Sequence, residues 1–164
     1  MIVYHGSTLE IRTPEIICNE VGRDFGYAFY TTDIKEQAER WAKRKAKLLS
    51  RRLGTAQIPV VSIYVWQPDI ALSVKEFDEA GMEWLDLVVL CRSNAAYTHG
   101  YDVVIGKIAN DNVGETISYV VQGIMRKEDA IERLRFEQIN NQLAFCTDAS
   151  LKTLSFQSSY SPEG

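Results

Sequence analysis

Apolar residues along this chain follow two different periods, and each period predicts its own set of elements. Strands are predicted where β-branched and aromatic residues gather between turn-forming residues. Such stretches cover residues 1–5, Ile58–Trp66, Tyr101–Ala109 and 140–147. Another short strand is predicted to end at Thr32, because an aromatic segment leads from there directly into a helical pattern.

The longest helical pattern covers residues 33–54, with Asp33 predicted as the N-cap and Gly54 as the stop. An acidic first turn follows Asp33, as a helix N-terminus favours. Apolar residues recur at helical spacing, at Ala38, Trp41, Ala42, Ala46 and Leu49. This stretch therefore carries the strongest helix prediction of the chain.

Three more helices are predicted over residues 81–94, 112–125 and 127–138, although the Val-Val-Leu centre of the first is also compatible with a strand. Strands and helices therefore mix without regular alternation, which predicts an α+β fold rather than a doubly wound sheet. The length of 164 residues suits one domain. We expect that domain over residues 1–156, followed by a flexible polar tail over 157–164.

Composition indicates the class of protein and its cellular compartment. The apolar fraction of 46% and the charged fraction of 24% are ordinary for a soluble globular protein. With no long apolar run and no charged-then-apolar leader, we expect a cytoplasmic protein that does not enter a membrane. Cys18, Cys91 and Cys146 are widely spaced and accompanied by only two histidines. They are predicted to be reduced, mostly buried thiols, and no metal site is expected.

Charge is unevenly distributed along the chain. The net charge is −4, which argues against a nucleic-acid-binding surface over the whole protein. The stretch from Arg40 to Arg52 nevertheless carries only basic charges. Two interpretations stay open for this basic helix: a solvated face whose long side chains cover apolar neighbours, or a docking surface for an acidic partner or nucleic acid.

Three short motifs carry candidate chemistry. His5, in the apolar strand "VYHGST", is either a hydrogen-bonded core residue or a functional group. Because side chains alternate along a strand, Phe29 and Tyr30 must point to opposite faces, so that one face can be core and the other a pocket wall. Gln142 begins a buried strand, where it either caps a sheet edge or points into a site.

Together these motifs resemble the ADP-ribosyltransferase superfamily, in the branch of the poly(ADP-ribose) polymerases and the diphtheria-type toxins. The resemblance is carried by His5–Ser7 in a first strand and by Phe-Gly-x-x-Phe-Tyr-x-Thr-Asp over 25–33 ahead of a helix. Its third part is Gln-Leu-x-Phe over 142–145. The whole chain is more closely similar to a small bacterial family of unknown function in that superfamily, often found beside a second small gene in the manner of toxin–antitoxin pairs.

The resemblance implies a split, two-sheet fold with helices packed around it, NAD as co-substrate and no metal. The implied function is mono-ADP-ribosylation of a macromolecular acceptor, protein or nucleic acid, by a toxin that a small antitoxin protein can bind. Two alternatives stay open: a module that binds NAD or ADP-ribose without turnover, and an NAD glycohydrolase in which water is the acceptor.

The resemblance also implies roles for individual residues. His5 would bind a ribose hydroxyl of NAD, and the backbone of Gly6 would pair with the nicotinamide carboxamide. Tyr30 would lie against one face of the nicotinamide ring. Trp41 would stack on the other face, unless it belongs to the helix core. Gln142 would contact the 2′-hydroxyl of the reacting ribose, so that the catalytic set is His5, Tyr30 and Gln142.

This chain departs from the family pattern at two positions. Ala38 replaces a serine that binds the nicotinamide amide in the polymerases, so that contact is expected either to be absent or to come from Ser7 or Thr32. Gln142 replaces the usual glutamate, and it keeps the hydrogen bonds while losing the negative charge. This loss argues against polymer elongation, and Gln142→Glu is expected to retain or raise NAD cleavage.

Three charged residues are further candidates. Arg23 stands just before the aromatic motif and is a candidate for binding the pyrophosphate of NAD. Asp111 follows a predicted strand and is a candidate for activating the acceptor. Glu137 lies five residues before Gln142, where it either substitutes for the missing glutamate or lies on a solvated helix end.

Overall fold

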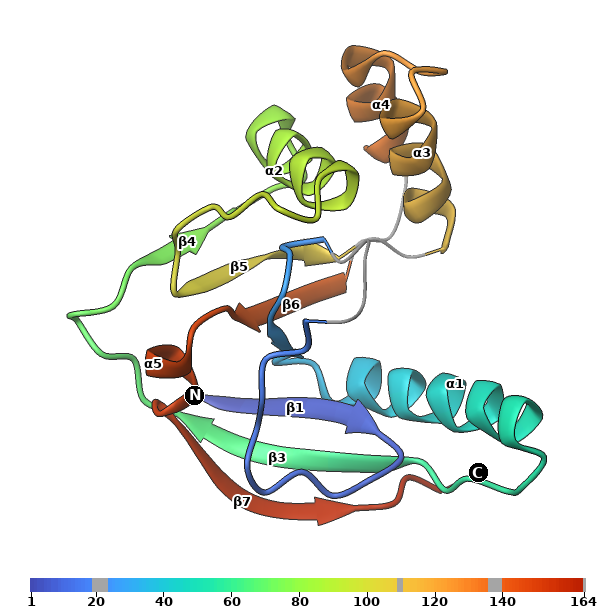
Figure 1. Ribbon diagram of the computed structural model, residues 1–164, viewed down its shortest axis with the longest axis vertical. Coiled ribbons are helices and arrows are strands. Elements are labelled where there is room, and N and C mark those ends of the chain that lie inside the picture. The colour runs from blue at the N-terminus through green and yellow to red at the C-terminus, as the bar shows by residue number, and fades with distance from the viewer. Residues whose placement is uncertain (19–23, 109–110, 136–139, 164) are drawn as a thin grey trace.

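The computed structural model describes residues 1–18, 24–108, 111–135 and 140–163, which fold into two sheets and the helices around them (Figure 1). This confirms the predicted α+β class. The strands are β1 (Ile2–Ser7), β2 (Phe29–Thr31), β3 (Val60–Trp66), β4 (Val74–Glu76), β5 (Val103–Ile108), β6 (Asn140–Phe145) and β7 (Leu154–Tyr160). The helices are α1 (Lys35–Leu53), α2 (Met82–Ser93), α3 (Asp111–Val121), α4 (Lys127–Leu134) and α5 (Asp148–Leu151).

The two sheets differ in size and are joined where β1 passes the end of β2. The smaller sheet has the order β1-β3-β7, and the larger has the order β2-β6-β5-β4, with β4 and β5 as a parallel pair (Figure 1). Tyr4 of β1 exchanges two backbone hydrogen bonds with Thr32, at 2.8 and 2.9 Å. The chain then turns into α1 while β1 continues to Ser7. The sheets therefore part directly after the Tyr4–Thr32 pair.

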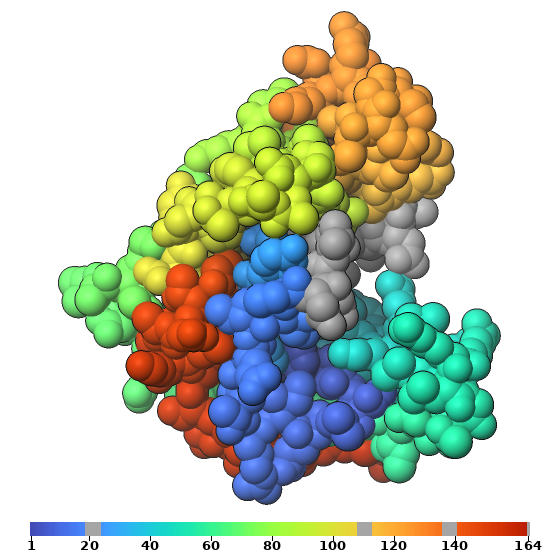
Figure 2. Space-filling view, in the orientation of Figure 1, coloured from blue at the N-terminus to red at the C-terminus, as the bar shows by residue number. Residues whose placement is uncertain are grey.

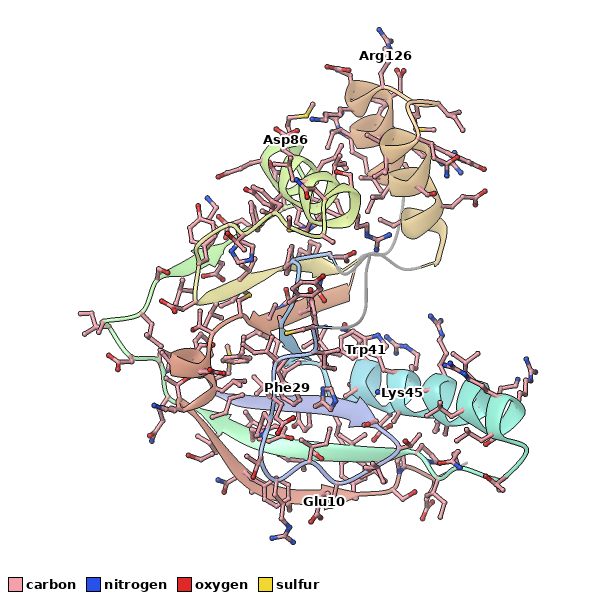
Figure 3. All side chains as sticks on the ribbon, in the orientation of Figure 1. Glu10, Phe29, Trp41, Lys45, Asp86 and Arg126 are labelled. Atoms are coloured by element: carbon pink, nitrogen blue, oxygen red, sulfur yellow. The ribbon has the colours of Figure 1, made fainter. Side chains whose placement is uncertain are left out.

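Helix α1 packs one face on the smaller sheet and exposes the other. Ala38 and Ala42 are buried against Val61 of β3, whereas most of the basic side chains are exposed. Figure 2 shows the helix as a projecting corner of the molecule, and Figure 3 shows Trp41 and Lys45 on it. Its predicted stop is confirmed, because Gly54 has a φ of 72° in the left-handed region.

The predicted N-cap of α1 is wrong by one position. Ile34 is the N-cap residue, and its amide donates to the hydroxyl of Thr32 at 3.1 Å. Asp33 instead accepts a hydrogen bond from the side chain of Asn141, at 3.0 Å, and so ties the start of α1 to β6. A partner from a distant strand has replaced the local cap that the sequence pattern predicts.

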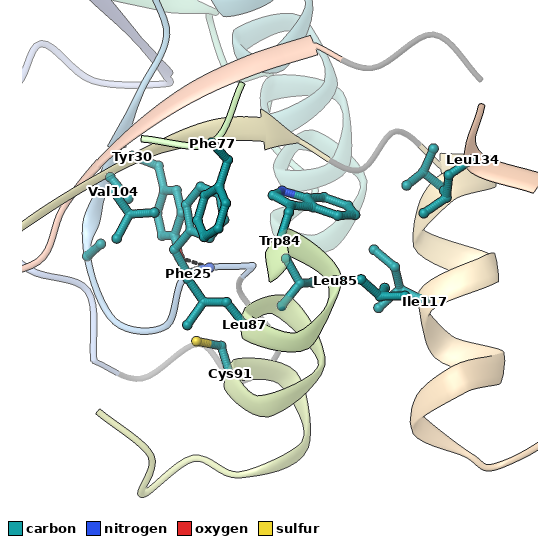
Figure 4. Close-up of a cluster of buried hydrophobic side chains, with 14 of the residues drawn as sticks. Phe25, Tyr30, Phe77, Trp84, Leu85, Leu87, Cys91, Val104, Ile117 and Leu134 are labelled. Atoms are coloured by element: carbon teal, nitrogen blue, oxygen red, sulfur yellow. Dashed lines mark hydrogen bonds between the residues drawn. The ribbon is translucent and has the colours of Figure 1, made fainter. Parts of the chain in front are cut away.

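The main core lies between the larger sheet and the helices α2, α3 and α4 (Figure 4). Within residues 81–94, for which helix and strand were both open, Met82–Ser93 form helix α2, and its predicted buried face is confirmed at Trp84, Leu87, Val88 and Cys91. A second core lies between the two sheets and includes Phe29 and Phe145. Phe29 and Tyr30 belong to different cores, as strand alternation predicts.

The tail that was expected to be flexible is a strand over part of its length. Residues up to Tyr160 belong to β7, which pairs with β3 from Leu154 opposite Trp66 to Tyr160 opposite Val61. Serine and glutamine dominate the outer positions, so local composition indicates a tail. Pairing with β3 and packing of Phe156 against the inter-sheet core override that composition.

Candidate functional site

His5 connects the two sheets beside the point where they part. Its Nδ1 atom lies 2.6 Å from the backbone carbonyl oxygen of Tyr30, and its ring stacks on Phe29 with centroids 4.3 Å apart. Because a carbonyl oxygen can only accept, Nδ1 carries the proton. The imidazole is therefore buried and held in one orientation, between β1 and β2.

Gly6 is the point at which α1 comes closest to β1. A Cβ atom at this position would lie 2.3 Å from the backbone oxygen of Ala38 and 2.8 Å from the amide nitrogen of Ala42, so no side chain fits. Backbone groups two residues apart on a strand point to the same side. The amide and carbonyl of Gly6 therefore point to the side on which Tyr4 pairs with Thr32, where the sheets part.

Ser7 follows Gly6 in β1, Thr32 pairs with Tyr4 two residues before Gly6, and Trp41 lies close to Gly6. Ser7 is buried and shares with His5 one face of β1, and Thr32 is buried with its hydroxyl used at the start of α1. Trp41 is half-buried, and its Cβ lies 3.1 Å from the Cβ position of Gly6. It is absent from the three buried clusters of the described residues, whereas Ala38 and Ala42 are members.

Tyr30 is held rigidly at both ends. Its backbone bonds His5, and its hydroxyl donates to the carbonyl oxygen of Gly26 at 2.5 Å. The same hydroxyl accepts from the amide of Phe25 at 3.1 Å, and the ring packs in the main core beside Phe25 (Figure 4). With only 9% of the residue exposed, the ring is a fixed wall of the core.

Gln142 is buried in the middle of the larger sheet. Strand β6 lies between β2 and β5, and the register places Gln142 opposite Gly106. The interpretation of Gln142 as an edge cap is therefore wrong. Because Ala144 pairs with Tyr30 and lies two residues from Gln142, the side chains of Tyr30 and Gln142 share one face of this sheet.

An ion pair that sequence reasoning missed lies against Gln142. Its Nε2 atom donates to Oδ2 of Asp24 at 3.3 Å, and Nε of Arg92 donates to Oδ1 of Asp24 at 2.8 Å. Nη2 of Arg92 donates to the same oxygen. Asp24 immediately precedes the aromatic motif and Arg92 lies in the last turn of α2, but nothing in the local pattern indicates that they meet.

Gln37 is a second residue that sequence reasoning missed. It is fully buried on α1, donates through Nε2 to the backbone oxygen of Asn141 at 2.7 Å and accepts from the amide of Asn141 at 3.1 Å. Gln142 is the next residue of β6, so this clamp fixes the start of α1 against the strand that carries Gln142. A buried polar residue on the apolar face of a predicted helix was the available signal.

The motif residues thus meet around β2, but not on one face. His5 contacts Phe29 on the inter-sheet side, whereas the side chains of Tyr30 and Gln142 lie on the main-core side. Arg23 and Glu137 lie outside the described residues. Asp111 begins α3, and its side chain lies outside them as well.

A separate cleft of about 740 Å³ lies on the outer side of the Phe25–Tyr27 turn. Aromatic side chains line much of it, among them Tyr27, Tyr97, His99 and Tyr101. His5, Tyr30 and Gln142 are not among its lining residues. The cleft is lined by Phe25 and Gly26 of this turn, whose backbone binds the hydroxyl of Tyr30.

The fold and this cluster define an α+β protein with a buried polar site where two sheets part. Residues 1–156 match the family described as a protein of unknown function, DUF3990, and the chain belongs to that family. No curated protein matches the sequence. None of the helices in the described ranges combines the length and the apolar character that crossing a membrane requires.

Proposed function

We propose that this protein is a cytoplasmic, NAD-dependent mono-ADP-ribosyltransferase and the toxin of a bacterial toxin–antitoxin pair. One observation carries the proposal: the three motifs that resemble ADP-ribosyltransferases meet around one short strand. His5 bonds the backbone of Tyr30, and Tyr30 shares a sheet face with Gln142. Residues this far apart in the chain converge on β2 and its two neighbouring strands, which supports the proposal.

The proposed reaction breaks the bond between nicotinamide and C1′ of ribose, and the electron pair leaves with nicotinamide. An acceptor nucleophile then bonds C1′ and gives up a proton. The transition state resembles an oxocarbenium ion, so the protein must position both parts of NAD and stabilise positive charge. No covalent protein nucleophile is required, which suits a site made of imidazole, phenol and amide groups.

The geometry supports a role for the residues near Gly6. The backbone of Gly6 points to the side where the sheets part, as pairing with a carboxamide requires. Trp41 starts beside Gly6 and is half-exposed, so it is available to stack on nicotinamide. The bond from Nδ1 to Tyr30 orients the His5 ring for a ribose hydroxyl. Tyr30 completes the site as a fixed wall.

Labelled NAD tests the proposal directly. Incubation with a bacterial lysate should transfer label to protein or nucleic acid, and a His5→Ala/Tyr30→Ala variant should transfer none. Near-ultraviolet circular dichroism of both proteins establishes that equal amounts of folded protein are compared. Equal labelling by the two proteins would contradict the assignment.

A binding module without turnover is the second candidate, favoured by the uncharged amide of Gln142 at the position where glutamate is usual. Calorimetry combined with a nicotinamide-release assay separates the two functions. Tight binding of NAD without nicotinamide release would favour the module. Nicotinamide release without labelled macromolecule would instead identify an NAD glycohydrolase.

A further inference from the structure

The contact between Asp24 and Gln142 determines which way the Gln142 amide faces. A carboxylate oxygen held by a guanidinium accepts hydrogen bonds, so the atom of Gln142 that meets Asp24 must be the NH₂ group. Oε1 of Gln142 therefore points away from Asp24. Asp24 is 5% exposed and Gln142 is 1% exposed, so water does not compete strongly for this bond.

Arg92 anchors the carboxylate that makes this contact. Its Nε donates to Oδ1 of Asp24, while Gln142 donates to Oδ2, so the two oxygens have different partners. The guanidinium is 24% exposed and comes from α2, on the far side of the main core. Hydrogen bonds thus link Arg92 to Asp24 and Asp24 to Gln142. Through them, the position of α2 affects the orientation of one side chain of β6.

From this geometry we infer that Asp24 is a positioning residue for Gln142. It holds the NH₂ group, so that Oε1 is the atom presented to the ligand, and it places a negative charge directly behind the amide. Within the proposed function, on which the catalytic part of this inference rests, Oε1 accepts from the ribose 2′-hydroxyl. In the family pattern, a glutamate at the position of Gln142 supplies a negative charge. In this chain the charge is on Asp24, one hydrogen bond farther from the reaction centre.

The inference reverses the expectation for a glutamate at this position. Gln142→Glu brings two carboxylates to about the distance that now separates the amide from Asp24, in a buried site. Like charges at such a distance cannot both stay ionised without a large penalty. The variant is therefore expected to lose stability and NAD cleavage, unless residue 24 is changed as well.

A charge exchange between the two positions tests the inference. Asp24→Asn, Gln142→Glu and the double variant are compared with the wild type in melting temperature, kcat and KM for NAD. Each single change should lower kcat by at least about tenfold, as loss of a positioned polar group does, and the double variant should recover most of that loss. In the double variant, the new amide at position 24 can donate to the carboxylate at 142 and still accept from Arg92.

Asp86→Asn is the matched control, because it removes a carboxylate on α2 that also forms an ion pair, here with Lys127 of α4. Asp86 bonds Lys127 at 2.7 Å and lies far from β6 (Figure 3). This variant should keep the wild-type kcat. The comparison separates the specific effect of Asp24 from the general effect of breaking an ion pair on this helix.

The outcomes separate this inference from the proposed function. If the wild type releases no nicotinamide, the proposed function fails, and the melting temperatures alone decide the pairing of Asp24 with Gln142. A double variant that melts above both single variants supports the pairing. Additive losses in the double variant, or a Gln142→Glu variant that is as stable and active as the wild type, would overturn it.

Discussion

The imidazole of His5 bonds the backbone of Tyr30 through Nδ1, at 2.6 Å, and this bond crosses from one sheet to the other. Replacing His5 by Phe keeps a ring for stacking on Phe29 but leaves a buried carbonyl without its donor. We expect a loss of about 1–3 kcal/mol in the free energy of unfolding. Denaturant titration measures that loss, and NAD labelling should disappear.

A second, partly buried bond from a ring nitrogen to a carbonyl provides the control. Trp84 donates through Nε1 to the backbone oxygen of Lys107 at 2.9 Å, in the main core. Trp84→Phe should also lower stability, but it should leave NAD labelling per folded molecule unchanged. Full labelling by His5→Phe would show that the histidine only connects the sheets.

Close approach of α1 to β1 predicts a strong effect of Gly6→Ala. The added Cβ would lie 2.3 Å from the Ala38 backbone oxygen, so the helix must move away from the strand. We expect a loss of about 1–3 kcal/mol in unfolding free energy, the usual range for overpacking. Gly114→Ala is the control, because nothing lies within 4 Å of that Cβ position and helical alanine is favoured. Equal stability of the two variants would contradict the tight contact.

The basic side chains of α1 predict salt-dependent binding of an acidic partner. Exposed cations that contact several phosphates lose affinity steeply as salt rises. Changing Lys43, Arg44 and Lys47 to glutamine should therefore reduce labelling of macromolecules and leave NAD binding intact. Labelling assays and calorimetry between about 50 and 200 mM salt measure both quantities.

Helix α4 offers a control with the same change in charge. Arg126, Arg133 and Arg135 lie in or beside α4 and are exposed. Their replacement by glutamine should leave labelling unchanged. If the two triple variants behave alike at every salt concentration, the basic helix is a solvated face, which is the other interpretation of its composition.

The half-buried, hydrogen-bonded imidazole of His99 predicts that the stability of the protein falls in mild acid. Its Nδ1 accepts from the amide of Tyr101 at 3.0 Å, and its Nε2 donates to the carbonyl oxygen of Phe25 at 3.0 Å. Burial lowers the pKa of His99 below its usual 6.5, because the charged form is poorly solvated. The folded state thus favours neutral His99. The contribution of His99 to the free energy of unfolding is therefore complete above pH 6.5, and it decreases as the pH falls toward the lowered pKa.

Two measurements check this behaviour. A titration followed by nuclear magnetic resonance should place the midpoint for His99 below 6.5. Urea unfolding at pH 7.5 and 5.5 should show a smaller loss of stability in His99→Gln than in the wild type. An unchanged pH dependence in the variant would assign the acid sensitivity to other groups.

The three cysteines should differ sharply in reactivity. Burial raises the pKa of Cys91 and of Cys146 to about 12, whereas Cys18 is exposed. The thiolate is the reactive form, so iodoacetamide at pH 8 should alkylate Cys18 alone in the folded protein. Mass spectrometry counts the adducts, and unfolding in urea should make all three sites reactive. Rapid labelling of Cys91 under native conditions would contradict its burial.

The local sequence pattern predicted the helices and strands that are determined by their own residues. The period of apolar residues and the glycine stop indicated α1, and β-branched residues indicated β3 and β5. The pairing of Asp24 with Arg92 was not predictable, because it joins a loop and a helix that are distant in the chain. The path of residues 157–160 depends on an available edge of β3 rather than on their own composition. Contacts with residues distant in the chain thus determine the ion pair and the strand end that the local pattern could not indicate.

The order of strands in the two sheets also constrains when the motif residues can come together. Strand β3 is flanked by β1 and β7, which are far apart in the chain, while β6 fills the middle of the larger sheet (Figure 1). Until β6 leaves the ribosome, β2 and β5 have no common neighbour and Gln142 does not yet exist in the nascent chain. Such long-range pairing is slow to form. A nascent chain that ends before β6 therefore carries His5 and Tyr30 without Gln142, and the three motif residues come together only after β6 has been synthesised.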